Sequence, residues 1–508
     1  MPSYDAIIIG GGTNGLAAAG RLAKAGRKVL VLESADVAGG GARTQEFAKG
    51  YKVSSVAHLL NLLDPRVEQG LGLNLSLAAT NISTTALSPS GDHLLLEGNY
   101  GETVTGTLSE TDRASWRELR QKLIRFANVL KPFKSMTPPR LGKGVGNEMM
   151  KLASLGLKIR GLGREDLREF MRLMLINVAD VLDDELKDDR LKGVIAFDTV
   201  LGAHLGPRSP NSLLLLFNRL AGEALSIPKG GMGSVAAAMA KAVQALGVEI
   251  RLNAKVQSVT IADDKATGVT LENGESHAAK TVVSAINPKT TFLDLVGPRH
   301  LDTGMVRRAS NILMRGNAVK LHLALKGAPN FKGANLNTRL VIAPSVRAVE
   351  DAFNPVKYGE FSENPVMEIV IPSAFEEGLA PNGHHVLSAI VQYAPFTLNT
   401  KVRAAFMKCI MATLETYAPG IGKLVVKSEL LTPEDLENQY GFIGGNWHHG
   451  ELSAEQMLFL RPFIGAAQYE TVIPGLWLAG AGSHPGGGIS GAAGWNAAER
   501  ILKVEGRR

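Results

Sequence analysis

Short apolar runs and helix-favouring stretches alternate at the start of this chain. The run from Tyr4 to Ile9 is rich in β-branched residues and predicts a buried strand. Small, helix-favouring residues follow from Leu16 to Ala25, and a second apolar run from Lys28 to Leu32 ends at the acidic Glu33. This order predicts a strand, a helix and a second parallel strand, which together form a βαβ unit.

The middle of the chain shows two other patterns. Apolar residues at helical spacing predict a helical block over about 108–220, with one long helix from Arg164 to Leu182. Strict alternation from Val319 to Leu325 predicts a half-exposed strand whose polar face carries Lys320 and His322. Similar patterns predict a hairpin, two more strands and a helix, at Thr84–Leu87 with His93–Leu96, Val366–Ile371, Val386–Tyr393 and Val402–Tyr417.

A glycine-rich turn joins the first strand to the first helix. It reads Gly10-Gly11-Gly12-Thr13-Asn14-Gly15, the GxGxxG pattern of dinucleotide-binding βαβ units. Gly10 permits the tight turn, Gly12 removes a Cβ that would hold a pyrophosphate away, and Gly15 lets the helix pack closely. The helix N-terminus attracts phosphates, and Glu33 can accept hydrogen bonds from ribose hydroxyls. A purely structural glycine turn is the alternative, and the motif alone does not separate FAD from NAD.

Two later stretches again show predicted strands and glycine-rich loops like those at the start of the chain. Strands are predicted at Val248–Asn253, Lys255–Ile261 and Thr281–Ala285, with a hairpin turn at Asn273-Gly274. The chain ends with a strand at Gly475–Leu478, a glycine-rich loop and a helix to Leu502, an arrangement that can bind anionic and polar ring groups. Gly230-Gly231-Met232-Gly233 follows Pro-Lys rather than a strand, so we predict no second dinucleotide site.

These motifs resemble a known family. The GxGxxG turn, Glu33, and Gly40-Gly41-Ala42-Arg43-Thr44 resemble the FAD signature of phytoene desaturase-like and amine oxidase-like flavoproteins. The late segment His484-Pro485-Gly486-Gly487-Gly488 and Asn496-Ala497-Ala498 resembles the phytoene desaturase-like family in particular. Gly444-Gly445-Asn446, His449-Gly450-Glu451 and Arg461-Pro462 resemble its branch of pyridine nucleotide-disulfide oxidoreductase domain-containing protein 2.

The resemblance implies FAD as cofactor and one extended cradle for it. The residues that it places at the cofactor, together with those of the glycine turn, are Gly10, Gly12, Thr13, Asn14, Gly15, Glu33, Ser34, Gly40, Gly41, Arg43, His58, Leu59, Val256, Ala285, Gly482, Ile489, Ser490 and Ala493.

The expected fold is α/β, with a Rossmann-type FAD-binding domain in an amine oxidase-like layout and an inserted α+β substrate domain. We assign residues 1–105, 221–305 and 462–508 to the FAD-binding domain. Residues 106–220 and 306–461 are assigned to the substrate domain, as a helical cap and an antiparallel sheet.

Composition supports a globular protein of more than one domain. The chain has 508 residues, 45% hydrophobic and 20% charged, and a net charge of +7. No dense basic stripe interleaved with aromatics is present, so nucleic acid is not an expected partner. Cys409 is the only cysteine, which excludes an intrachain disulfide and a CxxC redox pair. No run reaches the ~18 apolar residues of a membrane span, and the first strand leaves no room for a signal peptide. We therefore expect a cytoplasmic protein.

Three histidines are the candidate catalytic residues. His58, His449 and His484 lie in segments that the resemblance places near the flavin, and a structural hydrogen bond is the alternative role for each. His449 or His484 is the best candidate for a base that takes a substrate proton. No HExxH or Cys/His cluster is present, so no metal is expected.

The function we expect is FAD-dependent oxidation, with hydride passing from a carbon of a mostly apolar substrate to flavin N5. A flavin amine oxidase on the same scaffold and a non-catalytic FAD-containing binding or chaperone-like protein are the alternatives. The electron acceptor, oxygen or quinone, and the oligomeric state stay open. Residues 143–164 combine basic and apolar side chains, so they are either a solvated amphipathic helix or a peripheral membrane contact.

Overall fold

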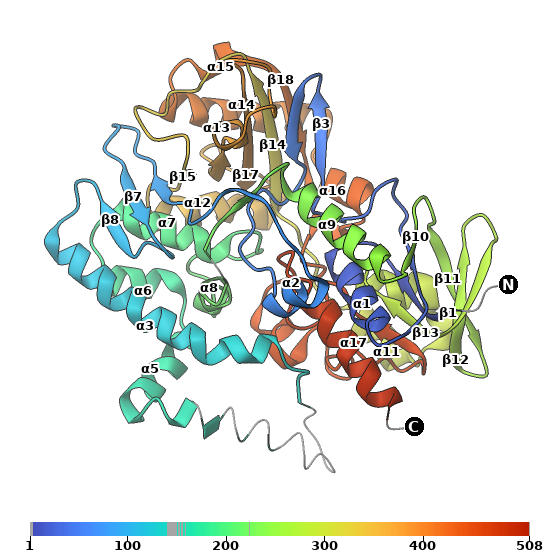
Figure 1. Ribbon diagram of the computed structural model, residues 1–508. Coiled ribbons are helices and arrows are strands. Elements are labelled where there is room, and N and C mark those ends of the chain that lie inside the picture. Colours follow the sequence, from blue (N-terminus) through green and yellow to red (C-terminus); the bar gives the residue numbers. More distant parts are fainter. Residues whose placement is uncertain are drawn as a thin grey trace.

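The structure is a computed structural model that describes residues 4–139, 150, 153, 156–157, 159–222 and 224–506. Two sheets and a block of helices surround a common centre (Figure 1). The sheet that contains the N-terminal strand lies on the right of this view, the second sheet at the top, and the helical block on the left.

The first sheet is mainly parallel and built from distant parts of the chain. Its strands run in the order β10-β2-β1-β13-β12-β11, and β19 also pairs with β13. Ile7 pairs with Leu30 on one side and with Val282 on the other, both in parallel register. The predicted βαβ unit is therefore present. The strands are β1 (Tyr4–Ile9), β2 (Val29–Leu32), β10 (Glu249–Arg251), β11 (Val256–Ala262), β12 (Lys265–Leu271), β13 (Ser276–Ser284) and β19 (Leu476–Leu478).

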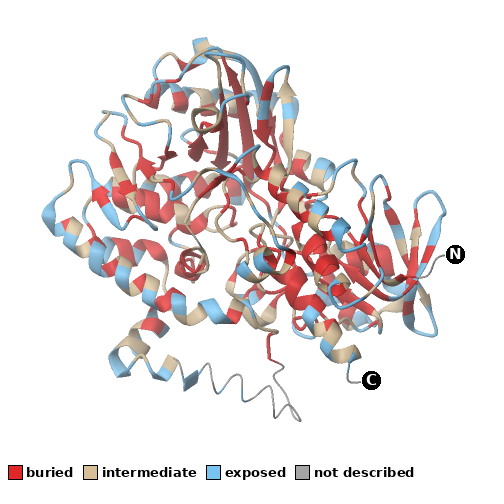
Figure 2. Cartoon of the chain, viewed as in Figure 1, coloured by how far each residue is buried: buried red, intermediate tan, exposed pale blue. Residues whose placement is uncertain are grey.

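Both faces of this sheet are covered, which explains why its strands are continuous apolar runs. Ile8 of β1 faces a core shared with four helices, and Ile7 faces a second core formed with the β11–β12 hairpin. The first core appears as the buried red helices beside the sheet in Figure 2. Its helices are α1 (Thr13–Ala23), α2 (Pro65–Leu71), α9 (Met232–Ala245) and α17 (Ala492–Glu505).

The second sheet has eight strands and is antiparallel except for one pair. Its order is β18-β14-β17-β16-β15-β6-β7-β8, and β15 pairs with β6 in parallel. The predicted hairpin is present as β6 and β7. The strands are β6 (Thr84–Ala86), β7 (Leu94–Glu97), β8 (Thr103–Thr105), β14 (Ala318–Leu325), β15 (Arg339–Ile342), β16 (Val366–Val370), β17 (His385–Gln392) and β18 (Val425–Leu431).

This pairing corrects one domain boundary. The assignment of residues 1–105 to the FAD-binding domain is wrong for the part from Thr84 onward, because β6, β7 and β8 extend the second sheet. The register of Leu340 with Thr85 shows the join directly. Local pattern identified the hairpin, but the strand that it pairs with lies about 250 residues away.

The strand β14 also differs from expectation. All eight of its residues are buried, including Lys320 and His322 on the face predicted to be exposed. Phe47 packs against the His322 ring, and Lys320 contacts His58. The polar face is thus covered by residues 44–58, which include the short ribbon β3 (Thr44–Ala48) and β4 (Tyr51–Ser54).

The helical block packs on its own core, which also takes in residues from the second sheet. The single helix predicted from Arg164 to Leu182 is wrong, because Ile176 is extended and the Asn177 side chain accepts a hydrogen bond from Asp180 N to begin a new helix. Most of residues 143–158 lie outside the described residues, as does much of the expected basic segment. The helices are α3 (Glu110–Lys134), α5 (Arg164–Leu175), α6 (Val178–Glu185), α7 (Asp189–Val200), α8 (Leu213–Leu220) and α12 (Val346–Phe353).

One further helix, α14 (Thr400–Tyr417), packs on the second sheet through Phe406, Ile410 and Leu414. No helix in the described part of the chain is long and apolar enough to cross a membrane. The shorter elements are β5 (Leu77–Ala79), β9 (Ile227–Pro228), α10 (Pro288–Thr290), α11 (Thr303–Ser310), α13 (Pro372–Phe375), α15 (Ile421–Leu424) and α16 (Pro433–Tyr440).

Candidate active site

A cavity of about 1070 Å³ lies where the two sheets and the helical block meet. Ile9, Leu32 and Ala285, at or next to the carboxyl ends of β1, β2 and β13, line one part of it. Carboxyl ends of parallel strands are where α/β folds bind their ligands. Leu215 of α8 and Ile390 of β17 line another part, so both domains contribute to the wall.

The glycine turn leaves room for a ligand at the start of α1. Gly10 has a φ of +98°, which only glycine adopts without strain. A Cβ on Gly12 would meet nothing closer than the Gly40 Cα, at 3.9 Å, so the space beside it is open. No side chain caps α1, which leaves its first N–H groups free for an anion such as a pyrophosphate.

Glu33 stands beside this turn with its carboxylate held in place. One oxygen accepts a hydrogen bond from Gly11 N at 2.7 Å, and the other accepts one from Ala35 N at 2.9 Å. Arg43 Nη2 lies 4.0 Å from the same carboxylate. Oε1 also accepts a hydrogen bond from Ser34 Oγ at 3.3 Å, whereas Oε2 keeps a second lone pair with which Glu33 can accept a hydrogen bond from a ribose hydroxyl.

Several buried polar atoms in the cavity wall have no partner within the described protein. They are Asn14 Oδ1, Arg43 Nε, His448 Nδ1 and His449 Nδ1. Buried polar groups are normally hydrogen-bonded. The free helix N-terminus, the open glycine pair and these unpaired atoms match the pyrophosphate, hydroxyl and ring polar groups of FAD. The residues present therefore fit this cofactor.

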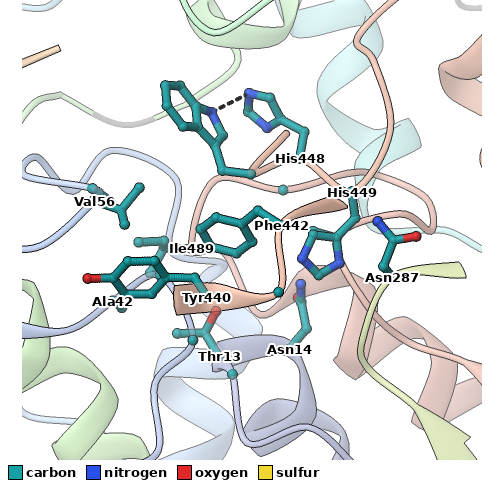
Figure 3. A pocket seen from close by; sticks show the side chains of 18 of the residues that line it. Thr13, Asn14, Ala42, Val56, Asn287, Tyr440, Phe442, His448, His449 and Ile489 are labelled. Atoms are coloured by element: carbon teal, nitrogen blue, oxygen red, sulfur yellow. Dashed lines mark hydrogen bonds between the residues drawn. The ribbon is translucent and has the colours of Figure 1, made fainter. Parts of the chain in front are cut away.

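His449 has an unpaired ring nitrogen in the cavity wall. Its Nδ1 is buried and has no hydrogen-bond partner among the described residues. Burial, reinforced by the charge of Arg461, lowers the pKa of His449 to about 4, so the ring is neutral at pH 7. Figure 3 shows it pointing toward Asn14, with Asn287 beside it.

The neighbouring His448 is a site residue that the sequence did not single out. Trp447 Nε1–H donates to His448 Nε2 at 3.0 Å, so in the neutral ring Nδ1 carries the proton and is an unpaired donor. Its ring points away from His449 (Figure 3). Tyr440 and Phe442 stack beside them with ring centroids 5.7 Å apart. The aromatic and imidazole residues between glycines in segment 441–451 were the signal that marked this region as unusual.

His58 belongs to a buried charge cluster. Lys320 Nζ donates to His58 Nδ1 at 2.8 Å, and His58 Nε2 donates to Glu368 at 3.1 Å. Burial, with the Lys320 charge as the next cause, lowers the pKa of His58 to about 4. Burial also lowers the pKa of Lys320, to about 7. His58 lines the cavity, but both of its ring nitrogens are engaged, so the structure disfavours it as a free base.

His484 does not line the cavity, which corrects its prediction as a catalytic base. It is buried between two backbone carbonyls, with Nδ1 3.0 Å from Leu458 O and Nε2 2.9 Å from Phe133 O. It therefore ties the late glycine loop to the end of α3. Arg461 has a similar structural role, because its guanidinium donates to the carbonyls of His448, Gly450 and Ala481.

The structure brings most of the predicted cofactor residues together. Four of them lie behind the wall, because they make close backbone or helix contacts instead: Gly15, Gly482, Ser490 and Ala493. Within the described ranges, no three His, Cys, Asp or Glu side chains gather as a metal site. The predicted residues that line the cavity are Gly10, Gly12, Thr13, Asn14, Glu33, Ser34, Gly40, Gly41, Arg43, His58, Leu59, Val256, Ala285, His449 and Ile489.

Comparison with known sequences identifies the family. The model of the flavin-containing amine oxidoreductases matches residues 15–502. Pyridine nucleotide-disulfide oxidoreductase domain-containing protein 2 of Rattus norvegicus is 31% identical, over 99% of this chain and 94% of the relative. A neurosporene-forming phytoene desaturase of Cereibacter sphaeroides is 26% identical, over 99% of this chain and 95% of the relative. The expected resemblance to phytoene desaturase-like proteins is thus confirmed.

Comparison with solved structures finds the fold of this chain in amine oxidases. A putrescine oxidase variant superposes with a TM-score of 0.63 and 18% identity, over 100% of this chain and 99% of the other. The expected α/β fold with an amine oxidase-like layout is confirmed. The residues of the cavity fit FAD. This chain belongs to the flavin-containing amine oxidoreductase family and is an FAD-dependent oxidoreductase.

Proposed function

We propose that the protein dehydrogenates a carbon of a largely apolar organic substrate, in the manner of a phytoene dehydrogenase. One observation carries this proposal. Beyond the glycine turn, part of the cavity wall consists of leucine and isoleucine side chains, which an apolar ligand would cover well. They are Leu62, Leu201, Leu215, Leu225, Ile390 and Leu452.

Bound FAD supplies a two-electron acceptor for the hydride, and the protein supplies binding, orientation and exclusion of water. Glu33 and the start of α1 hold the adenosine and pyrophosphate half. His449 presents a neutral ring with an unpaired Nδ1, and we propose that this nitrogen receives the substrate proton or orients the group that loses it. Arg461 holds the His448 and Gly450 carbonyls, and so fixes the loop that carries this ring.

A flavin amine oxidase is the second candidate, favoured by the family description and by carboxylates in the wall. Two of these carboxylates, Asp198 and Glu368, are not free to bind an amine. Arg339 donates to Glu368 at 2.6 Å and to Asp198 at 2.5 Å. A cationic amine would have to compete with this guanidinium, so we favour the apolar substrate.

Anaerobic titration of the FAD-loaded protein tests these functions. The visible absorption of oxidised flavin should bleach with apolar hydride donors, such as terpenoid alkenes and long-chain compounds, and not with putrescine. Bleaching by amines alone would support the amine oxidase. Bound FAD that no donor reduces would support a binding or chaperone-like role, and a protein that takes up no FAD would remove the proposal. Re-oxidation by oxygen with peroxide release, or by a quinone, would identify the acceptor.

Contact with a membrane surface is also a proposal. It is supported by four apolar side chains that are more than half exposed near α5: Met150, Leu157, Met171 and Leu175. The test is flotation with phosphatidylglycerol vesicles. Binding that the double variant Met171→Gln/Leu175→Gln weakens supports it, and absence of binding by the parent protein contradicts it.

A further inference from the structure

A cluster of five charged side chains lies at the cavity wall, and we call it the 198/219 cluster. Asp198, Arg219 and Glu368 line the cavity, whereas the fully buried Lys320 and Arg339 lie behind the wall. Arg339 is fully buried and bonds to both carboxylates. Arg219 Nη2 lies 3.3 Å from Asp198 Oδ1. Lys320 joins through His58, which bonds to Glu368. The cluster links α7, α8 and three strands of the second sheet.

Donors exceed acceptors in this cluster. It holds two arginines and two carboxylates, Lys320 adds part of a positive charge because its pKa is lowered to about 7, and His58 is neutral because of its lowered pKa. Arg219 Nε and Arg339 Nη1 are buried atoms with no partner in the described protein. The guanidinium of Arg219 makes no hydrogen bond to the described residues, only the ion pair with Asp198. An unpaired buried donor is costly, so an acceptor from outside the protein would stabilise this arrangement.

A ligand can reach Arg219. Its side chain is 15% exposed, and it lines both the main cavity and a smaller adjoining cavity of about 50 Å³. Asp198 lines both cavities as well. Leu215 and Leu225 line the main cavity beside it. The site therefore combines one accessible guanidinium with an apolar surround.

We propose that Arg219 binds the carboxylate of an otherwise apolar substrate, so that the protein acts on a long-chain organic acid. This deepens the proposed function and rests on it. A carboxylate can take two guanidinium N–H groups at once and would supply the acceptor that the unpaired Arg219 donor lacks. Asp198 keeps its bond to Arg339 when the ligand binds, so neither charge is left unpaired.

Other ligand classes fit less well. A hydrocarbon would bury the Arg219 guanidinium without giving it an acceptor. A protonated primary amine would place a second positive charge beside Arg219 and would supply no acceptor. A neutral alcohol offers one acceptor oxygen and no charge, so it should bind more weakly than the acid of the same chain length.

Calorimetric titration of the FAD-loaded protein with decanoate, decan-1-ol and decylamine tests the proposal. Decanoate should bind at least tenfold more tightly than either other ligand. Arg219→Gln should abolish this preference while FAD content stays unchanged, and Arg219→Lys should retain part of it. Arg117→Gln, an equal change of charge at an exposed position of α3, should leave the preference intact.

The results separate this inference from the proposed function. Equal binding of decanoate and decan-1-ol, or a preference that survives Arg219→Gln, would show that water alone serves the cluster, and the inference would be overturned. Tighter binding of decylamine would overturn it in favour of an amine site. If the Arg219→Gln protein does not fold, the comparison of the three ligands on the parent protein and on Arg219→Lys still decides. Absence of FAD uptake or of flavin bleaching counts against the proposed function, whereas calorimetry reports carboxylate binding independently.

Discussion

Lys320 Nζ donates a hydrogen bond to His58 Nδ1 at 2.8 Å, across 262 residues of sequence. The bond joins the second sheet to a segment that lines the FAD cavity. It leaves a lysine amine fully buried, with its pKa lowered to about 7. This amine changes its charge near neutral pH, inside the cavity wall.

Replacing this lysine should change how stability depends on pH. Lys320 has a folded pKa of about 7, below its ordinary value of 10.5, so between these values the unfolded state binds more protons. Its contribution to stability therefore rises with pH across this window, by about 1.4 kcal/mol per pH unit. The stability of Lys320→Met relative to the parent should thus be highest near pH 6 and fall toward pH 10. Melting temperatures across this range measure it, and a difference independent of pH would contradict the buried-amine assignment.

Gly12 and Gly15 should respond differently to the same substitution. A Cβ on Gly12 enters open space, so Gly12→Ala should fold normally yet bind FAD at least tenfold more weakly. A Cβ on Gly15 would overlap the Gly10 carbonyl oxygen, so Gly15→Ala should lower the melting temperature of the FAD-free protein. The measurements are thermal melts without FAD and FAD titration by flavin fluorescence. Equal loss of stability in both variants would argue against an open cradle at Gly12.

Glu33 should contribute to FAD affinity through its charge. Glu33→Gln keeps the shape but weakens the hydrogen bonds from Gly11 N and to the ligand, each worth about 1.5–3 kcal/mol when charged. The dissociation constant of FAD should rise by at least tenfold. Glu377→Gln is the matched control, because Glu377 is exposed and does not line the cavity. If both variants bind FAD as the parent does, Glu33 is not a ribose ligand.

The two predicted catalytic histidines should separate by their phenotypes. His449→Phe removes the unpaired Nδ1 that we propose as the proton acceptor, so flavin reduction by substrate should slow at least tenfold while FAD is retained. With its pKa lowered to about 4, His449 stays neutral from pH 6 to 9, so its titration should not appear in the pH profile of this rate over that range.

His484→Phe should instead lower the melting temperature, because it breaks the link between Leu458 and Phe133, and leave the rate per bound flavin near that of the parent. A large drop in that rate, with normal stability, would restore His484 as a catalytic residue.

Local sequence was enough to predict the glycine turn and the strands and helix next to it. The apolar runs, the GxGxxG spacing and Glu33 predicted β1, α1, β2 and one end of the cradle, because turn and helix geometry depend on near neighbours. The same holds for the β6–β7 hairpin, but not for the sheet that it joins. His449 was identified through resemblance, whereas His448 was passed over, because nothing in the sequence shows which ring nitrogen its neighbours occupy.

The sequence by itself determined the dinucleotide turn, the strand and helix patterns and, by resemblance, the FAD family. Only the tertiary structure decided what covers the polar face of β14. Period-two alternation shows that Lys320 and His322 share a face, but it cannot show that residues 44–58 fold over that face. The resulting burial lowers the pKa of Lys320. The 198/219 cluster likewise exists only in the folded chain, because its ion pairs join residues from distant elements. Charge and burial of this kind depend on contacts across the whole chain, and those contacts exist only once both domains have packed together.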